Sequence, residues 1–405
     1  MSAMDKTLHD VAIVARKVIM KLLPDRVPVT FVGADAVREM CEAIGHLGVR
    51  KPLVVTDAGL VKAGIVEQVT KQLEAAGLEP IVYDGVEPDP TFAQVGAGIA
   101  RYRGEGCDCI VAVGGGSSMD AAKLMAAILG NDKPAEKLEG LLKVRKPTVP
   151  LFAIPTTAGT GSEVTVVAVI SDTHTHTKKF FIDPKLIPSM AALDPTLMVG
   201  LPPAITAATG MDALTHAVES YLCSTSTAQT EAYALTSVRL VFANLPTAYK
   251  KGTDLAARKA MALASYYGGL AFTRTGVGYV HAIAHAFGAY YRTPHGLANA
   301  IVLPHVLEYS KDAARRRLAE LADAVALGGN SDAEKADRFI EAVRNLESEV
   351  GIPPTLDALR RSDIPAIARQ AVTEAHMDYP VPRYMDQSEC ERMLERMLST
   401  EAVAA

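Results

Sequence analysis

The sequence predicts an α/β nucleotide-binding domain with a parallel, Rossmann-like sheet, followed by an all-α domain. Residues 28 to about 190 alternate short β-branched runs with helical stretches, a pattern typical of βαβ units. After "LPP" at 201–203 the chain becomes rich in Ala and Leu, with helical periodicity and few β-branched runs. The length of 405 residues exceeds what one hydrophobic core usually organises. We therefore expect two domains, residues 28–200 and 201–405.

Five apolar runs are the expected strands of the first domain: "VPVTFVG", "KPLVVTD", "EPIVYDG", "CDCIVAVGGG" and "VPLFAIPTT". Between the second and third runs, "GIVEQVTKQLEAAG" has the period of an amphipathic helix, and Gly77 stands where that helix should stop. Residues 1–27 form an N-terminal extension. We expect an amphipathic helix there, because Arg16, Lys17 and Lys21 interrupt any signal-peptide core.

Composition and charge predict a globular protein that binds neither nucleic acid nor a membrane. Hydrophobic residues make up 49%, enough for a large core, and the net charge of −5 comes without long runs of like charge. No run approaches ~20 uninterrupted apolar residues, so no membrane span is expected. The five cysteines are scattered and odd in number, which predicts no disulfide framework and favours a reducing cytoplasm.

A glycine-rich turn follows the fourth apolar run. In "CIVAVGGGSSMDAAKLMAA" the residues Gly114, Gly115, Gly116 and Ser117 stand between a strand and a helix. Glycines let backbone N–H groups approach a ligand closely, and a helix N-terminus favours phosphate. The turn therefore predicts a pyrophosphate site. It is not the G-x-G-x-x-G fingerprint, and an ordinary tight turn is an equal alternative.

Two other strand ends carry polar residues that suit a nucleotide. Asp57 could accept hydrogen bonds from a ribose 2′-hydroxyl and repel a 2′-phosphate, which favours NAD over NADP. The alternative is that Asp57 only caps the next helix. The stretch "IPTTAGTGSEVT" supplies the hydroxyls of Thr156, Thr157 and Thr160, which could hold a polar ligand or form a loop of ST-turns.

Ionisable side chains in the second half predict a metal site. Asp212 and His216 are four residues apart, and so are His281 and His285, which places each pair on one helix face. His295 opens "HGLANAIVLP" and could project from a helix start toward the same point. The apolar neighbours of His281 and His285 offer no obvious polar partner, and buried imidazoles need partners. One carboxylate and three imidazoles suit Fe²⁺, Zn²⁺ or Mn²⁺; the alternative is hydrogen-bonded core histidines.

Two more histidines, His174 and His176, lie in the polar stretch "SDTHTHTKK". They are two residues apart in what we expect to be a hairpin. We expect both to be solvated and not to bind metal.

Specific motifs resemble those of the iron-containing alcohol dehydrogenases, the group that includes lactaldehyde reductase and propane-1,3-diol dehydrogenase: "GGGSSMDAAK", "PTTAGTGSE", "LPPAITAATGMDALTHAVE", "HAIAH" and "PHGLANAIVLP". The resemblance runs from about Pro28 to beyond residue 380 and implies a dehydroquinate synthase-like fold. It also implies that His285 lies near the nicotinamide and the substrate. The residues that match the family's metal ligands, normally of Fe²⁺ with Zn²⁺ as an alternative, are Asp212, His216, His281 and His295.

The same resemblance implies the cofactor contacts. Lys179 matches a lysine near the nicotinamide ribose, although Lys178 is adjacent to it, and Asp89 stands where the family often has Asn. The other matching positions are Asp57, the turn from Gly114 to Ser117 (Gly114, Gly115, Gly116, Ser117) and the segment from Thr156 to Thr160 (including Thr157).

Arg274 is a further departure, because the family often has Asn there. If Arg274 faces the substrate it favours an anionic one; the other role is a surface or subunit ion pair. A homodimer or larger homo-oligomer is implied by the resemblance.

These features predict a metal-dependent NAD(H) alcohol dehydrogenase and aldehyde reductase, with NADP(H) less favoured. Hydride would pass between nicotinamide and a primary alcohol or diol held on the metal, and His285 would relay the alcohol proton. We expect the active site in the cleft between the two domains. The alternatives are a zinc-dependent enzyme resembling glycerol dehydrogenase and a non-catalytic NAD- or metal-binding protein that retains the fold.

Overall fold

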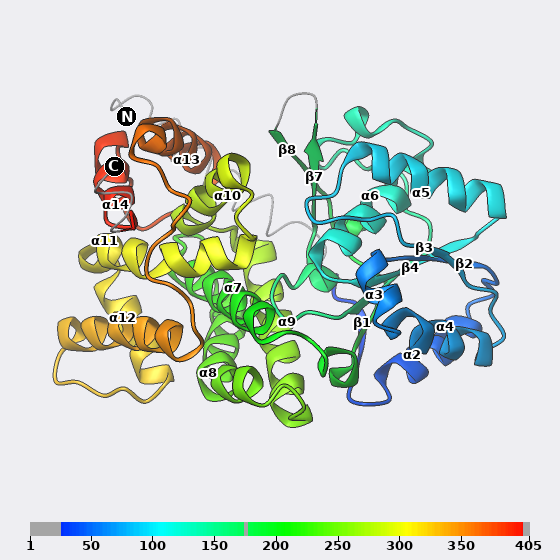
Figure 1. Cartoon of the computed structure of the whole chain (residues 1–405), viewed down its shortest axis with the longest axis horizontal. Helices are drawn as coiled ribbons and strands as arrows, with labels where there is room; N and C mark the ends of the chain where they lie inside the picture. Colours follow the sequence, from blue (N-terminus) through cyan, green and yellow to red (C-terminus); the bar gives the residue numbers. More distant parts are fainter. Residues whose placement is uncertain (1–25, 174–176, 400–405) are drawn as a thin grey trace. The chain divides into compact units, whose positions relative to one another are not determined.

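Figure 1 shows the computed structural model of the chain, which describes residues 26–173 and 177–399. The chain divides into two compact units between Gly200 and Leu201. The predicted helix of the N-terminal extension, as well as His174 and His176, lies outside the described residues. The predicted fold class is confirmed, because the first unit contains a parallel sheet with helices and the second is helical.

The main sheet of the α/β unit has six strands in the order β1-β9-β6-β4-β2-β3, and all its pairs are parallel. Five strands match the predicted apolar runs. The sixth, β9, follows a crossover that the sequence pattern did not reveal. The strands are β1 (Val29–Val32), β2 (Pro52–Val55), β3 (Ile81–Tyr83), β4 (Cys109–Gly114), β6 (Leu151–Pro155) and β9 (Met190–Leu193).

Helices follow the strands, as βαβ units require. They are α2 (Ala36–Gly45), α3 (Ala58–Lys62), α4 (Ile65–Ala75), α5 (Phe92–Glu105) and α6 (Gly116–Asn131). Successive residues of β4 point into two different cores: Ile110 and Ala112 pack with residues of α5 and α6, and Val111 and Val113 pack with residues of α2 and α4. All six residues of β4 are buried, which explains its continuous apolar sequence.

A second, three-stranded sheet has the order β5-β8-β7, from β5 (Gly140–Leu141), β8 (Thr177–Ile182) and β7 (Val167–Asp172). Strands β7 and β8 pair antiparallel, so they form the arms of the hairpin expected around residues 174–176. The hairpin was therefore expected, whereas the pairing of β5 with β8, which makes this small sheet mixed, was not. Strands β7 and β8 are only partly buried, so they lack the continuous apolar runs that marked the main sheet.

The second unit consists of helices, as predicted, and between residues 201 and 399 its described residues contain no strand longer than an isolated bridge. Helix α7 is buried along most of its length and packs against α8, α9 and α11. The helices are α7 (Pro203–Leu222), α8 (Ala228–Lys250), α9 (Leu255–Thr275), α10 (Tyr279–Tyr291), α11 (His295–Ala324), α12 (Asp332–Glu349), α13 (Ile364–Asp378) and α14 (Gln387–Glu395).

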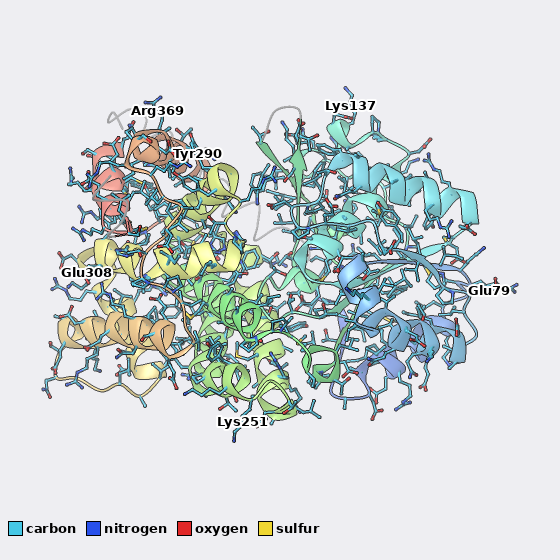
Figure 2. The ribbon with its side chains drawn as sticks, in the orientation of Figure 1. Glu79, Lys137, Lys251, Tyr290, Glu308 and Arg369 are labelled. Carbon is cyan, nitrogen blue, oxygen red and sulfur yellow. The ribbon has the colours of Figure 1, made fainter. Side chains whose placement is uncertain are left out.

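Charged side chains lie mostly on the surface of each unit. Glu79, Lys137, Lys251 and Arg369 are exposed and point outward (Figure 2). None of the helices in the described ranges is long and apolar enough to cross a membrane. All five cysteines are buried and unpaired, which confirms that the chain has no disulfide framework.

Candidate active site

Helix α7 carries the first two predicted metal ligands on one face. Asp212 and His216 are both buried, and the His216 Nδ1 atom lies 4.0 Å from the Asp212 Oδ2 atom. Their spacing of four residues places them one turn apart, as the sequence predicted. The His216 ring stacks on Phe272 of α9, with ring centroids 4.1 Å apart. This stacking leaves the edge of the imidazole, with its nitrogen atoms, available for a ligand.

Helix α10 brings His281 to the same place. One potential ligand atom from each of Asp212, His216 and His281 lies within 4.8 Å of the others, and all three residues are buried. The centroids of the His216 and His281 rings are 4.6 Å apart. A carboxylate and two imidazoles from two helices therefore converge on one point.

Helix α11 adds His295 as its first residue, which agrees with the predicted helix start. The His295 Nε2 atom lies 3.7 Å from Asp212 Oδ1. Gly296 permits this approach, because a Cβ atom there would lie only 2.4 Å from the backbone oxygen of Ala208 on α7. The side chain of His295 is 34% exposed, so it forms the accessible side of the cluster.

Asn299, one turn further along α11, marks the point where the ligand atoms meet. Its Nδ2 atom donates to Asp212 Oδ1 at 2.7 Å and lies 3.3 Å from His281 Nε2 and 3.1 Å from His295 Nε2. Three acceptor atoms thus surround one electropositive amide group. The same three atoms are placed to surround a small cation.

The donor set fits a divalent metal ion. The His216 Nδ1 atom is buried and has no hydrogen-bond partner among the described residues, which is unfavourable unless a ligand is present. Burial lowers the pKa of His281 well below its ordinary value, so the imidazole is neutral and can donate a lone pair. Burial raises the pKa of Asp212, and a cation beside it would oppose that shift. Imidazole and carboxylate ligands suit Fe²⁺, Zn²⁺ or Mn²⁺.

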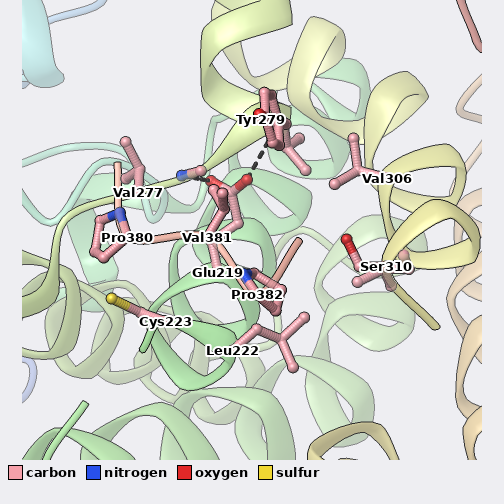
Figure 3. Close-up of a pocket in the computed structure, with 13 residues that line it drawn as sticks. Glu219, Leu222, Cys223, Val277, Tyr279, Val306, Ser310, Pro380, Val381 and Pro382 are labelled. Atoms are coloured by element: carbon pink, nitrogen blue, oxygen red, sulfur yellow. Dashed lines mark hydrogen bonds between the residues drawn. The ribbon is translucent and has the colours of Figure 1, made fainter. Parts of the chain in front are cut away.

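Glu219 contacts the ring nitrogen of His281 that faces away from the cluster. Its Oε2 atom lies 2.6 Å from His281 Nδ1, and its two oxygens accept the backbone N–H groups of Gly278 and Val280, each at 2.8 Å (Figure 3). A Cβ atom at Gly278 would lie 2.7 Å from Glu219 Oε1, so the glycine is needed for this contact. With Nδ1 bonded to Glu219, the Nε2 atom of His281 faces the cluster.

The Glu219 contact corrects the expectation that these histidines lack polar partners. The partner comes from α7 and not from the neighbouring residues of α10. Burial raises the pKa of Glu219 to about 7. A cavity of about 20 Å³ beside this carboxylate, lined also by Tyr279 and Ser310, has room for one water molecule (Figure 3).

His285, assigned to catalysis by the resemblance, lies beside the cluster. Its ring stacks on that of His295, with centroids 5.4 Å apart and an interplanar angle of 17°. Its Nδ1 atom lies 2.7 Å from Glu374 Oε1 of α13. His285 is therefore partnered in the same way as His281, but it is not among the residues whose ligand atoms converge within 4.8 Å of one another, which are Asp212, His216 and His281.

Three groups of predicted cofactor residues, Asp57, the glycine turn and the threonine segment, lie at the ends of three adjacent strands of the sheet, β2, β4 and β6. The glycine turn and the threonine segment lie against each other: a Cβ atom at Gly116 would lie 2.8 Å from Thr160 Cγ2, and one at Gly115 would lie 3.2 Å from Thr157 Oγ1. The Thr156 N–H group donates to the Gly114 carbonyl at 3.0 Å. Because the carboxyl ends of parallel strands share one edge, these residues form a single surface that suits a dinucleotide.

Asp57 at the end of β2 caps α3, because its Oδ1 atom accepts the N–H group of Leu60 at 3.0 Å. The capping role considered from the sequence is thus present. It does not conflict with a ribose contact, since a carboxylate has two oxygens and can accept several hydrogen bonds.

Asp89 and the two lysines of β8 occupy different contacts. Lys178 forms an ion pair with Asp89, with Nζ and Oδ1 3.0 Å apart, whereas Lys179 lies 3.4 Å from Glu139. Neighbouring residues of a strand point to opposite faces, so only one of the two lysines can reach the Asp89 loop. Lys178 is the one that does so, and the contact of Lys179 with a nicotinamide ribose, which the resemblance implies, stays a prediction.

Asp89 adopts a left-handed conformation with φ of 58°. Asn and Asp tolerate this region better than most residues, which explains why Asp can stand here in place of the Asn that the family often has.

Two family models match the sequence. "Iron-containing alcohol dehydrogenase" matches residues 28–195, and "Fe-containing alcohol dehydrogenase family, C-terminal" matches residues 206–398. The chain belongs to the iron-containing alcohol dehydrogenase family. This membership confirms the predicted fold and the reaction class, an oxidoreductase acting on alcohols.

Similar members of the iron-containing alcohol dehydrogenase family cover most of the chain. Lactaldehyde reductase of Escherichia coli (strain K12) is 41% identical over 348 residues, which are 84% of this chain and 91% of that protein. The NAD-dependent methanol dehydrogenase of Bacillus methanolicus is 39% identical over 348 residues, which are 85% of this chain and 91% of that protein. A crystal structure of 1,3-propanediol oxidoreductase has a TM-score of 0.89 at 38% identity, covering 92% of this chain and 98% of that one.

Sequence reasoning missed several residues of this iron-containing alcohol dehydrogenase that support the site. Glu219 is three residues after His216, so helical spacing could have placed it on the ligand face of α7. Asn299 is four residues after His295, so the same spacing could have placed it beside that ligand, whereas Glu374 gave no such signal because helix packing brings it to His285. Arg274 lies in the last turn of α9 and is partly buried.

Proposed function

We propose that the chain is a metal-dependent NAD(H) alcohol dehydrogenase that also reduces aldehydes. The observation that carries the proposal is the buried convergence of Asp212, His216 and His281, with His295 at the accessible side. The proposed metal is Fe²⁺, after the family, with Zn²⁺ as the alternative that the same ligands accept. The proposed substrate is a small primary alcohol or diol, since the relatives include a methanol dehydrogenase, a lactaldehyde reductase and a 1,3-propanediol oxidoreductase.

When bound, the metal ion lowers the pKa of an alcohol hydroxyl and polarises an aldehyde carbonyl, and the nicotinamide exchanges the hydride. The protein's own residues prepare this chemistry. Glu219 holds the proton on Nδ1 of His281, so that Nε2 is free to bind. His285, beside His295, is placed to take the alcohol proton during oxidation and to return a proton during aldehyde reduction.

The edge formed by Asp57, the glycine turn and the threonine segment supports NAD(H) as the cofactor. A carboxylate at the end of β2 repels a 2′-phosphate, so NADP(H) is less favoured. The name of the methanol dehydrogenase relative, which is NAD-dependent, agrees with this proposal. The ion pair between Lys178 and Asp89 leads us to propose Lys178 beside Lys179 as a candidate for the nicotinamide ribose contact.

We also propose a cytoplasmic homo-oligomer, a dimer or larger. The five buried and unpaired cysteines support a reducing compartment, and the oligomer is an expectation from the family. Light scattering of the purified protein would measure the number of subunits.

The proposal is tested by metal-stripped protein reconstituted separately with Fe²⁺ and Zn²⁺, assayed for NAD⁺ reduction with a panel of short alcohols and diols. We expect turnover to return with Fe²⁺, to be strongest with short primary alcohols or diols, and to be weaker with NADP⁺. Protein that binds both NAD⁺ and metal but oxidises no alcohol and reduces no aldehyde would contradict it and favour the non-catalytic alternative.

A further inference from the structure

Glu374 of α13 contacts His285, the residue that carries the alcohol proton in the proposed function. His285 Nδ1 and Glu374 Oε1 are 2.7 Å apart, although 89 residues separate them in the sequence. The side chains of His285 and Glu374 are only 13% and 20% exposed. A contact this short between an imidazole and a carboxylate is a charge-assisted hydrogen bond. Glu374 therefore influences which ring nitrogen of His285 carries the proton.

Tyr379 contacts the same oxygen. Its hydroxyl donates to Glu374 Oε1 at 2.6 Å, and the residue is buried. Because an ionised carboxylate only accepts hydrogen bonds, the Nδ1 atom of His285 must be the donor in its contact with Oε1. In the neutral imidazole this contact places the proton on Nδ1 and leaves the other ring nitrogen, Nε2, as the proton acceptor.

Helix α13 is fixed against α10 at a second point, which makes the position of Glu374 well defined. The His376 Nε2 atom lies 3.0 Å from the Tyr279 hydroxyl oxygen, at the start of α10. The backbone N–H group of Met385 also donates to this hydroxyl oxygen, at 2.8 Å. The two helices are thus joined at two positions, by the pair of His285 and Glu374 and by the pair of Tyr279 and His376.

We propose that Glu374 is a positioning residue for His285, and that Tyr379 holds Glu374 in place. Glu374 keeps a proton on Nδ1 and presents the unprotonated Nε2 atom for the alcohol proton, which moves from the hydroxyl oxygen to Nε2. The inference rests on the proposed function, because it assigns a partner to the group that carries the proton. It extends the site to a segment, residues 374–379, from which no ligand or cofactor contact had been predicted.

The tautomer of His285 provides a test that does not depend on activity. Long-range ¹H–¹⁵N correlation spectra of zinc-loaded protein labelled at histidine would report the protonated nitrogen, and the signal missing in His285→Asn identifies the residue. We expect a proton on Nδ1 and none on Nε2 in the wild type. A proton on Nε2 with none on Nδ1 would overturn the inference.

The variant Glu374→Gln tests the consequence for catalysis. Its amide oxygen is a weaker acceptor for the Nδ1 proton, and its amide nitrogen can donate to Nδ1 instead, which favours the tautomer with the proton on Nε2, the wrong nitrogen for accepting the alcohol proton. We expect kcat for alcohol oxidation to fall roughly 100- to 1000-fold, within the contribution of general acid–base catalysis. The KM for NAD⁺ and the bound metal should stay within twofold of wild type. The matched control is Glu341→Gln, which removes the same charge from an exposed position on α12 and should leave kcat unchanged.

A double variant separates this inference from the proposed function. In a His285→Asn background, Glu374→Gln should cause no further loss, because its effect passes through the missing ring. If the losses of kcat in the two single variants multiply in the double variant, the inference about Glu374 would be overturned while the proposed function would stand. A Glu374→Gln enzyme with wild-type kcat would have the same meaning. A fully active His285→Asn enzyme would instead contradict the proton transfer in the proposed function.

If Glu374→Gln fails to fold, Tyr379→Phe provides a milder test, since it keeps the carboxylate and removes one donor. We expect a roughly 2- to 10-fold lower kcat with unchanged KM for NAD⁺ and the same His285 tautomer with a broader signal. Unchanged kcat in this variant would overturn the role of Tyr379.

Discussion

The two units each contain a buried polar network, and the networks differ in how well their groups are satisfied. In the α/β unit, the Lys123 ammonium donates to Thr165 O, Thr165 Oγ1 and Val167 O at 2.8–3.0 Å. Asp120 accepts Ser162 Oγ at 2.7 Å and the N–H group of Val169 at 3.0 Å. In the helical unit, His216 Nδ1 is buried without a partner in the described chain, and lone pairs of Asp212, His281 and His295 meet at one point.

This difference separates a structural network from a ligand site. Burial lowers the pKa of Lys123 to about 8, yet its three acceptors complete its hydrogen bonding. The network joins α6 to the segment that follows the threonine loop, and nothing in it is left for a ligand. In the histidine cluster one amide, that of Asn299, faces three acceptors, and His216 Nδ1 has no partner among the described residues, so a bound cation would supply the missing positive charge. Buried charge alone therefore indicates little, whereas converging buried acceptors that outnumber their donors favour a metal site.

The largest expected effect comes from removing a ligand of the cluster. His281→Ala should abolish stoichiometric metal binding and lower turnover by more than ~1000-fold, because the ion loses one of its ligands. Binding of NADH, which we assign to the α/β unit, should persist. Metal analysis and NADH fluorescence measure the two effects. If His281→Ala kept both metal and activity, the histidine cluster would not differ from the Lys123 network as a ligand site differs from a structural network.

The matching change in the α/β unit should affect stability and not metal binding. Lys123→Met leaves Asp120 without its buried cation, which should lower stability by roughly 3 kcal/mol. We expect the melting temperature of this unit to fall by roughly 6–12 °C, measured by calorimetry. Metal content at 25 °C should equal that of the wild type, and loss of metal in a folded Lys123→Met protein would contradict our comparison.

A third change addresses the support of the cluster. Glu219→Gln keeps the size of the side chain but weakens its hold on the Nδ1 proton of His281. Changes of this kind typically cost ~10- to 100-fold in metal affinity, which competition with a chromophoric chelator would measure. An affinity within twofold of wild type would show that the cluster does not need Glu219.

The charge of Asp57 provides a smaller effect on the cofactor edge. Asp57→Gly and Asp57→Asn should both raise the ratio of kcat/KM for NADP⁺ to that for NAD⁺, by about tenfold, which corresponds to ~1.4 kcal/mol. Asn preserves the cap of α3, so agreement of the two variants would attribute the change to charge. A wild-type enzyme that already prefers NADP⁺ would show that our interpretation of Asp57 is wrong.

An effect on stability alone, without any change in metal or cofactor binding, is expected for Glu347 on α12, a buried group outside both networks. Its Oε1 atom has no hydrogen-bond partner among the described residues, and burial raises its pKa to about 9. Between pH 4.5, the ordinary value, and about 9, the folded protein binds more protons than the unfolded chain, so this group lowers stability as pH rises. Glu347→Gln removes that contribution. Its melting temperature relative to wild type should therefore increase from pH 5 to pH 9, and a difference independent of pH would contradict the shift.

Local patterns predicted much of this molecule, because they depend on neighbours in the sequence. The apolar runs identified β2, β4 and β6, and the spacing of four residues placed Asp212 and His216 on one face of α7. Strand β9 and the pairing of β5 with β8 were missed, since both depend on contacts between distant segments. The sequence also does not show in which direction Lys178 and Lys179 of β8 point, and their role at the cofactor stays a prediction.

The same limit explains the missing parts of the site. Glu374 reaches His285 because α13 packs on α10, and no periodicity relates positions 89 residues apart. Asn299 meets the ligands only because Gly296 allows α11 to approach α7. Ligand types and their local spacing were therefore predictable, whereas the groups that orient the ligands required the packing of helices.

The central claim is that Asp212, His216, His281 and His295 together hold one divalent metal ion. X-ray absorption at the zinc edge of zinc-loaded protein tests it most directly. We predict about three imidazole nitrogens at ~2.0–2.1 Å and one carboxylate oxygen at ~2.0–2.2 Å, with one imidazole lost in His295→Ala. A spectrum with fewer than two imidazoles, or one unchanged by that substitution, would contradict the account.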